Sequence, residues 1–470
     1  NLWNLAQFYE SYSSNSTITQ TNITISGDDI RIITHDDNYV EIIVWALPPP
    51  SCTLTPEEIV ELNNIETAIY DSETGPNDPK TVHEWCDTQF LWWVNRGLNE
   101  NTLPTSIQKI TNLQGIDLSH NYFTTLPTFV TSMTWVSNLN ISGNQITILT
   151  SSIGNMTQLT NLDLEDNQLI SLPTEIGNLS SLEVLFLNNN QLTSLPLEIG
   201  DLTNLTSLNF AYNQIESLPA EIGNLTNLIY LSAESNQIWV SLPNSIGNLS
   251  TLQELYLGWN QIPNLPESMS NLTSLMRLEA HHNLITNIPT NIDNLTMLNT
   301  LYLSYNQITT VPASFGNLIS LYSVSLSNNL ITSFEGDITN MNQVTSFDVS
   351  YNYLISLPNF VWPMNDLRYI YVDHNNLTSL PESIYDQQIL HIDARNNSLL
   401  TLPDSLVYFN NSYLDLYLSG NSSLIGDSLI DGLNQDFVTP YYFHWGTNNI
   451  TPTGKGLYIQ SWYGKFWIHN

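Results

Sequence analysis

Asparagine returns at a near-constant spacing through about two-thirds of this 470-residue chain. The steps are 23 residues long, with exceptions of 24, 22 and 24. Each asparagine ends the pattern L-x-x-L-x-L-x-x-N, as in residues 159–167. A repeat of this length predicts one structural unit per repeat, stacked on its neighbours. The recurring asparagines are Asn121, Asn144, Asn167, Asn190, Asn213, Asn236, Asn260, Asn283, Asn306, Asn329, Asn352, Asn375, Asn397 and Asn421.

The spacing within one repeat predicts how the units stack. Leucines two positions apart point to the same side of a short strand, and only a neighbouring repeat can bury them. The strands of successive repeats should therefore form one parallel sheet around a common core. The asparagine stands where the chain must turn, and its amide can both donate to and accept from the backbone of adjacent turns. We predict a hydrogen-bonded ladder of these side chains inside the stack.

Most copies run on into a second block of the type L-P-x-x-I-G-N-L, as in residues 172–179. The two blocks together resemble the leucine-rich repeat family, and the resemblance covers residues 98–425. It implies an α/β solenoid, a right-handed horseshoe of about 14 coils with a parallel β-sheet on its concave side. The proline is expected to stop the strand, and the glycine to close a turn on the outer wall.

The N-terminal segments do not repeat. Residues 1–50 are expected to be β-rich, with strands at 18–25, 30–34 and 39–46. Residues 51–97 are expected to form a cap. Its helix begins with a capping box made by Thr55 and Glu58, runs to about Tyr70, and covers the open end of the core.

The C-terminal segment, residues 426–470, holds many aromatic side chains. It is expected to form a second cap that ends in a hairpin about Tyr463 and Gly464. The alternative is that both end segments dock onto neighbouring molecules. Such head-to-tail contacts would produce a homo-oligomer or a filament coated with glycans.

Charge and motifs exclude several classes of function. The chain has 44 acidic against 9 basic residues, a net charge of −35, which argues against binding to nucleic acid. No apolar run reaches the length of about 18 residues expected of a transmembrane helix. Phosphate-binding loops and the common hydrolase motifs are also missing from the sequence. We therefore expect no enzyme, no cofactor, no metal and no membrane span in this chain.

Asn-x-Ser/Thr sequons predict a secreted or cell-surface glycoprotein carrying N-linked glycans. Six sequons follow a ladder asparagine by 11 or 12 residues, so sugars on them would line one flank of the stack. The alternative is that Gly-Asn-Leu-Thr is only the preferred turn sequence of this repeat. The sequons lie at Asn15, Asn22, Asn140, Asn155, Asn178, Asn204, Asn224, Asn248, Asn271, Asn294, Asn376, Asn396, Asn410, Asn421 and Asn449.

The two cysteines, Cys52 and Cys86, lie just ahead of the first repeat. Extracellular members of the leucine-rich repeat family often carry a disulfide-closed cap at this place, so the resemblance implies a disulfide between them. Two unrelated buried thiols are the alternative.

The concave face is the predicted binding surface. Its positions lie one, two, four and six residues before each ladder asparagine. From the fifth repeat onward these positions become aromatic, and Tyr, Trp and Arg often dominate interface energies. A protein, peptide or glycan ligand would suit this surface. The predicted ligand-binding residues are Tyr212, Tyr230, Tyr256, Trp259, Arg277, Glu279, His281, His282, Tyr302, Tyr305, Tyr351, Tyr369, Tyr371, Asp373, His374, His391, Asp393, Arg395 and Tyr417.

A structural interpretation of the same residues stays open at this point. Strands favour tyrosine in any case, and the charges could simply pair across neighbouring strands. Glu254 with Arg277, and Asp373 with Arg395, occupy equivalent positions in adjacent repeats and could form such pairs.

Overall fold

The structure is a computed structural model, and it falls into two compact units, Asn1–Gln168 and Leu169–Asn470. The residues that the structure describes are 23–25, 28–34, 40–44, 53–67, 80, 82–338, 340–358, 366–382, 389–403, 415–422, 424, 442–444, 458–462 and 465–469.

The first unit begins with a small antiparallel sheet in the order β1-β2-β3. Its strands are β1 (Ile23–Ile25), β2 (Asp28–Thr34) and β3 (Val40–Val44). The strands agree with the predicted β-rich start. Strands β2 and β3 pair from Ile30 with Val44 to Thr34 with Val40.

Helix α2 (Pro56–Thr67) follows, and it starts with the predicted capping box. The backbone N–H of Thr55 donates to Glu58 Oε2 at 2.8 Å, and the N–H of Glu58 donates to Thr55 Oγ1 at 3.3 Å. Lys109 Nζ lies 2.7 Å from Glu58 Oε1, and the indole N–H of Trp93 donates to Glu66 Oε2 at 2.9 Å. These contacts hold α2 against the first repeats.

The rest of the first unit repeats a strand and a short helix. Its parallel strands occur in the order β7-β6-β5-β4. The strands are β4 (Phe90–Trp92), β5 (Gly115–Asp117), β6 (Asn138–Asn140) and β7 (Asn161–Asp163). The helices are α3 (Val82–Cys86), η1 (Thr105–Lys109), α4 (Thr128–Thr131) and η2 (Ser151–Asn155).

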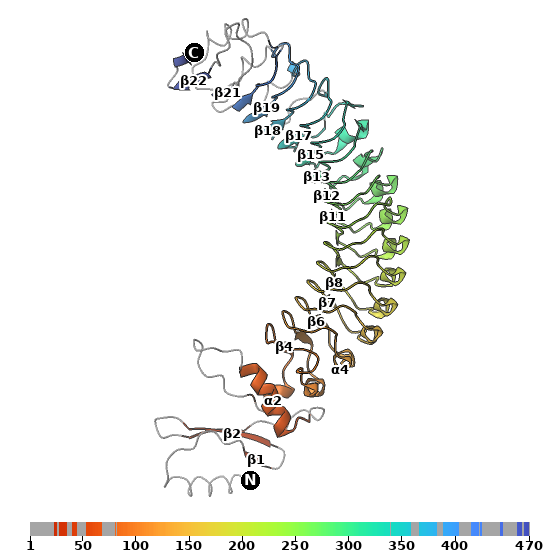
Figure 1. Cartoon of the computed structure of the whole chain (residues 1–470), viewed down its shortest axis with the longest axis vertical. Coiled ribbons are helices and arrows are strands. Elements are labelled where there is room, and N and C mark those ends of the chain that lie inside the picture. The colour runs from red at the N-terminus through yellow and green to blue at the C-terminus, as the bar shows by residue number, and fades with distance from the viewer. Residues whose placement is uncertain are drawn as a thin grey trace. The chain divides into compact units, whose positions relative to one another are not determined.

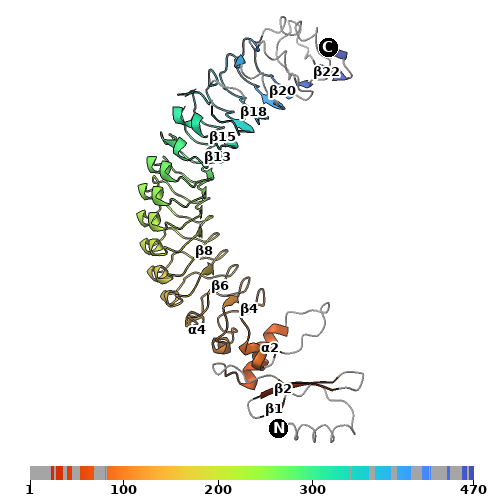
Figure 2. The same cartoon turned by 180° about the vertical axis from the view of Figure 1, so that it is seen from behind.

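The second unit has the same arrangement, and its described residues form twelve parallel strands from β8 to β21 in chain order. Within this unit the strands line one side and the short 3-10 helices lie on the other (Figures 1 and 2). The strands are β8 (Val184–Phe186), β9 (Ser207–Asn209), β10 (Tyr230–Ser232), β11 (Glu254–Tyr256), β12 (Arg277–Glu279), β13 (Thr300–Tyr302), β15 (Ser323–Ser325), β17 (Ser346–Asp348), β18 (Tyr369–Tyr371), β19 (His391–Asp393), β20 (Asp415–Tyr417) and β21 (Tyr442–His444).

The remaining elements of the second unit lie outside this sheet. A two-stranded parallel pair is formed by β14 (Thr310–Val311) and β16 (Ser333–Phe334). The 3-10 helices are η3 (Thr174–Asn178), η4 (Leu197–Asp201), η5 (Ala220–Asn224), η6 (Asn244–Asn248), η7 (Glu267–Asn271), η8 (Ile292–Asn294) and η9 (Ala313–Asn317).

Burial follows the leucine pattern. In β11 the central Leu255 is fully buried, while Glu254 and Tyr256 on either side are half-exposed. The same alternation occurs in most strands of the second unit, so one side chain per strand enters the core and two face outward. The predicted solenoid with a parallel sheet is confirmed.

The predicted asparagine ladder is also confirmed. Asn283 Nδ2 donates to the carbonyl oxygen of Leu257 in the preceding repeat at 2.9 Å and to that of Ala280 in its own repeat at 3.2 Å. Its Oδ1 accepts from the backbone N–H of Ile262, again in the preceding repeat, at 2.9 Å. One buried side chain thus joins two repeats through both its donor and its acceptor.

On the helical side, proline precedes most 3-10 helices with an extended backbone. The prediction that proline stops the strand was wrong for these repeats, because β8 already ends at Phe186 and Pro196 follows only at the start of η4. The role of glycine differs from the one predicted. The φ of Gly200 is not in the left-handed region, and a Cβ on Gly200 would lie 2.6 Å from the carbonyl oxygen of Glu221 in the next repeat. Glycine is required here because neighbouring repeats approach closely, and not because the turn needs its conformational freedom.

Beyond the last ladder asparagine the structure adds a strand that the sequence analysis missed. Strand β21 pairs with β20 in parallel, with Tyr442 opposite Asp415. The predicted terminal hairpin is present as β22 (Tyr458–Trp462) and β23 (Lys465–His469), which pair antiparallel with Trp462 opposite Lys465. Much of both end segments lies outside the described residues, so the two caps and the alternative of self-assembly stay predictions.

Replacing Asn283 with leucine should lower the free energy of unfolding by about 1–3 kcal/mol, because the buried N–H of Ile262 loses its partner. The carbonyls of Leu257 and Ala280 each lose one donor but keep the hydrogen bond from Asn260 Nδ2 and from Asn306 Nδ2. Urea unfolding and hydrogen exchange at the amide of Ile262 would measure the effect. The control is the substitution Gln261→Leu at an exposed site of the preceding repeat. Equal stability of the two variants would contradict the ladder's role.

Candidate functional site

The predicted concave residues occupy two different places in the repeat. Strand residues such as Tyr256 and Tyr302 belong to the sheet, where Glu279 lies in register between these two tyrosines. Residues directly before the ladder asparagine lie after the strand, in the turn. These turn residues are Tyr212, Trp259, His282, Tyr305, Tyr351 and His374.

The turn residue has a left-handed backbone in repeat after repeat. Its φ is 56° at Tyr212, 55° at Trp259 and 51° at His282. Such a conformation is unfavourable for side chains other than glycine. Here it lets the backbone N–H of Trp259 donate to the carbonyl of His281 in the next repeat at 3.0 Å. The same bond recurs along the stack and keeps the turn side chains of successive repeats side by side. Sequence reasoning did not separate these turn residues from those on the strands.

Three turn side chains form a stacked column, which we call the ring column: Trp259, His282 and Tyr305. The centroids of Trp259 and His282 lie 3.7 Å apart with an interplanar angle of 10°. Those of His282 and Tyr305 lie 4.1 Å apart at 9°. Trp259 and Tyr305 are each about half exposed, at 52% and 50%. The column therefore presents a rigid aromatic edge to solvent.

Strand residues beside the ring column add polar groups. The rings of Tyr230 and Tyr256 lie 5.5 Å apart, and the hydroxyl of Tyr256 donates to Glu254 Oε2 at 2.6 Å. Burial, and then this hydrogen bond to a carboxylate, raise the pKa of Tyr256. Arg277 lies opposite Glu254 in the register, but its Nη1 bonds Glu279 Oε1 at 2.9 Å. Arg277 therefore pairs with the carboxylate on its own strand and not with Glu254, the partner that the structural interpretation left open.

A second aromatic group lies on β18 to β20. The ring of His391 lies 5.0 Å from the rings of both Tyr371 and Tyr417, and 6.5 Å from that of Tyr369. The guanidinium carbon of Arg395 lies 5.4 Å from the Tyr417 ring, a cation–π contact. These residues form the second cluster of predicted site residues.

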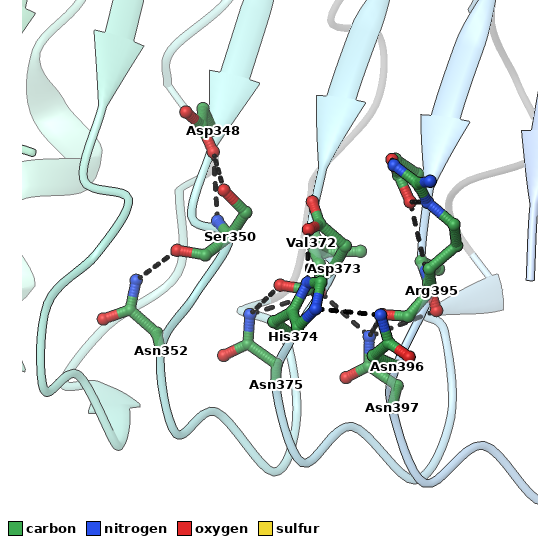
Figure 3. Close-up of polar contacts among 12 residues, drawn as sticks. Asp348, Ser350, Asn352, Val372, Asp373, His374, Asn375, Arg395, Asn396 and Asn397 are labelled. Carbon is green, nitrogen blue, oxygen red and sulfur yellow. Dashed lines mark hydrogen bonds and ion pairs between the residues drawn. The ribbon is translucent and has the colours of Figure 1, made fainter. Parts of the chain in front are cut away.

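The charges of this second cluster pair locally (Figure 3). Arg395 Nε donates to both carboxylate oxygens of Asp393, at 2.9 and 3.0 Å. Asp373 Oδ2 lies 2.8 Å from His374 Nδ1, and the His374 ring stacks on Tyr351 at 4.0 Å. Burial raises the pKa of Asp373, while the hydrogen bond to His374 opposes the rise. The direct partner of Arg395 is thus Asp393, and Asp373, the partner that the structural interpretation left open, acts on Arg395 only through its charge.

Serines separate the two clusters. The outward positions of β15 are Ser323 and Ser325, and the buried Ser327 follows this strand. Ser346 on β17 and the buried Ser350 are the serines of the next repeat. The structure thus divides the single predicted aromatic face into the group around the ring column and the second cluster. Among the described residues no group of three or more histidine, cysteine or carboxylate side chains is placed to hold a metal ion.

Known structures share this architecture. Family models for leucine-rich repeats match residues 150–239, 319–377 and 296–340, described as a leucine-rich repeat region, a leucine rich repeat, and two copies of leucine rich repeats. The Leptospira interrogans LRR protein LIC12759 is 28% identical, with a TM-score of 0.56, and the match covers 74% of this chain and 93% of that one. The chain is a leucine-rich repeat protein.

Two further structures resemble this leucine-rich repeat protein. A TDR receptor is 25% identical with a TM-score of 0.57, and the match covers 71% of this chain and 64% of the receptor. The functional domain of InlJ from Listeria monocytogenes, which includes a cysteine ladder, is 21% identical with a TM-score of 0.51, over 68% of this chain and 70% of that one. The second likeness shows the fold alone. A search of the curated proteins finds no match.

The sequons fall on different parts of the leucine-rich repeat. The six in phase with the repeat are exposed at the ends of 3-10 helices: Asn155, Asn178, Asn224, Asn248, Asn271 and Asn294. Asn204, Asn376 and Asn396 are exposed too, and Asn140 is half-buried on β6. Outside the described residues lie Asn15, Asn22, Asn410 and Asn449.

Asn421 is the sequon that the fold contradicts. Its side chain is fully buried, and Nδ2 donates to the carbonyls of Ala394 and Leu418 at 2.9 and 2.8 Å. A glycan on this nitrogen would be incompatible with the ladder, so this predicted site was wrong. Cys86 is buried in α3, but Cys52 lies outside the described residues, so the disulfide stays a prediction. Across the described chain, no helix has the length and apolar character needed to cross a membrane.

The position of His282 within the ring column predicts a pH effect. Burial, and then the neighbouring His281, lower the pKa of His282 below its ordinary value of 6.5. Between the two pKa values the unfolded chain binds more protons than the folded one. The stability contributed by neutral His282 is therefore present above the unfolded-state pKa and is lost as the pH falls through that value towards the folded pKa.

We expect the melting temperature of the wild type to fall more between pH 7.5 and 5.5 than that of His282→Phe, which keeps a ring in the column but does not titrate. An NMR titration of His282 would give its pKa directly. A pKa at or above the ordinary value, or equal pH dependence in both proteins, would contradict the prediction.

Proposed function

We propose that this protein is a non-enzymatic extracellular binding protein that recognises a protein, peptide or glycan through its aromatic concave face. The ring column with Tyr230, Tyr256 and Tyr302 beside it is the observation that carries this proposal. Rings held by stacking lose little side-chain entropy when a partner covers them, which favours binding. The second cluster on β18 to β20 extends the same surface.

The comparisons support the proposal at a coarser level. The leucine-rich repeat fold generally serves as a scaffold for protein interaction, and one structure similar to this chain is a receptor. The chain spans 64% of that receptor, so its ligand cannot be transferred to this protein. The acidic surface, with its net charge of −35, favours ligands that are neutral or basic.

A glycan-bearing flank is part of the proposal. The six exposed sequons at the ends of the 3-10 helices lie on the side of the repeats away from the strands, so sugars there would leave the concave face open. Residues on that face would remain free to contact a partner.

The glycan prediction can be tested by mass spectrometry of the protein secreted from eukaryotic cells. We expect glycans on Asn178, Asn224, Asn248 and Asn271, because these side chains are exposed, and none on Asn421, because its amide is buried in the ladder. Glycan-free peptides at all of the exposed sites would overturn the extracellular part of the proposal.

The binding prediction uses a combined variant in which Tyr256, Trp259, Tyr302 and Tyr305 become alanine. Full-length protein is panned against a displayed peptide library and a glycan array, and the recovered ligands are titrated against the variant. Loss of interface hot spots typically costs 2 kcal/mol or more, so affinity should fall by at least about 30-fold.

The control replaces one tryptophan and three tyrosines that are exposed at other positions of the repeat: Trp239, Tyr122, Tyr322 and Tyr353. This variant should bind the recovered ligands like the wild type. If the concave variant bound them equally well, or if both variants lost binding alike, the proposed site would be refuted.

A further inference from the structure

The ring column is interrupted where one turn side chain is short. The turn positions run in register through Tyr212, Ser235 and Trp259, since the N–H of Tyr212 donates to the carbonyl of Glu234 and that of Ser235 to the carbonyl of Gly258, both at 2.9 Å. Tyr212 and Trp259 thus flank a serine where other repeats place a ring. We call this place the Ser235 gap.

The column itself shows how wide such a gap is. His282 stands between Trp259 and Tyr305 at 3.7 and 4.1 Å, so those two outer rings lie about 8 Å apart with one flat ring between them. Carbon atoms in contact lie about 3.5–4.0 Å apart, so this width admits one planar group and no more. Ser235 has the same left-handed φ, 52°, and its side chain ends at the hydroxyl. The gap is therefore open to a planar group from a partner.

The exposure of the flanking rings agrees with an open gap. Tyr212 and Trp259 are 55% and 52% exposed. Between Tyr212 and His374 one more turn position lacks a ring, Asn328, which lies between Tyr305 and Tyr351. Asparagine fills that place with its own planar amide. The Ser235 gap differs because its own residue offers no flat group.

A carboxylate lies next to the gap. Glu234 directly precedes Ser235 and is half-exposed. Burial raises the pKa of Glu234, nearby His281 opposes the rise, and Glu279 adds to it. Within the described residues no lysine or arginine forms an ion pair with Glu234. A cation entering the gap would find a partly dehydrated acceptor without a permanent basic partner.

We propose that the Ser235 gap binds the guanidinium group of an arginine on a protein or peptide ligand, stacked between Tyr212 and Trp259 and paired with Glu234. This rests on the proposed function, because it assumes that the concave face binds the ligand. The guanidinium is planar, weakly hydrated and always charged, and it stacks on aromatic faces. Lysine carries the same charge as a compact, strongly hydrated ammonium that does not fill a flat gap.

The first test compares two probes on the full-length protein, acetyl-Gly-Arg-Gly-amide and acetyl-Gly-Lys-Gly-amide, by calorimetric titration. The arginine probe should bind about tenfold more tightly than the lysine probe, since stacking between two rings adds to the ion pair. Equal affinities would overturn the proposal, because charge alone would then explain binding.

Variants locate the site. Ser235→Tyr fills the gap with a ring that three other turn positions already carry at the same φ, so this variant is expected to fold. It should lose binding of the arginine probe, whereas Asn328→Tyr, which fills the other interruption, should bind like the wild type. Glu234→Gln keeps the gap but removes the charge, and should weaken binding about fivefold or more. Unchanged binding by both Ser235→Tyr and Glu234→Gln would refute the site.

The peptides recovered in the library experiment separate this proposal from the proposed function. If they lose binding to the alanine variant of the concave face and also lose it when their arginine is changed to lysine, both proposals stand. If they depend on the concave face but tolerate that change, the arginine site alone fails. If they ignore the concave face, the proposed function fails.

Discussion

The hydrogen bonds of the buried ladder asparagines determine the geometry of the rest of the repeats. Each amide donates to one carbonyl and accepts from one N–H of the preceding repeat, as Asn283 does with Leu257 and Ile262. Because those backbone groups are buried, any slip between repeats would leave them without partners. The ladder therefore holds neighbouring repeats at one register, and every outward position acquires a predictable neighbour.

Because this register is constant, residues at the same position of successive repeats become neighbours on the surface. The residue before each ladder asparagine takes a left-handed backbone, and its N–H bonds the next repeat. Side chains at this position must lie beside one another, so aromatic residues in successive repeats stack, and a serine among them leaves a gap. The binding surface that we propose is a consequence of this geometry together with the choice of side chain at one position.

The opposite side of the repeat is constrained differently. There the 3-10 helices approach so closely that Gly200 and its equivalents have no room for a Cβ, and the exposed asparagines of the sequons stand at the helix ends. The helical side thus repeats nearly the same residues, while the strand side changes from repeat to repeat. Close packing explains the uniform side, and access to solvent on the strand side permits the differences on which recognition depends.

Much of the fold follows from the sequence, because the period of the leucines and asparagines reports directly which residues enter the core. Local sequence patterns predicted the capping box at Thr55 and Glu58 and the terminal hairpin. The constant repeat predicted that Tyr256, Trp259, Tyr302 and Tyr305 belong to one surface. Strand β21 escaped prediction, since no ladder asparagine marks it.

Only the tertiary structure decided the partners of the outward side chains. Arg277 bonds a carboxylate two residues further along its own strand, and Arg395, which follows β19, bonds the carboxylate of Asp393 at the end of that strand. Trp259, His282 and Tyr305 stack because their turn is left-handed. The direction of a side chain depends on backbone torsions and on competition among several neighbours at similar distances. The sequence by itself determined which residues share a face, because the 23-residue period and the alternation of side chains along a strand fix the face of each residue. The contacts among those residues could be known only from the geometry of the stacked repeats.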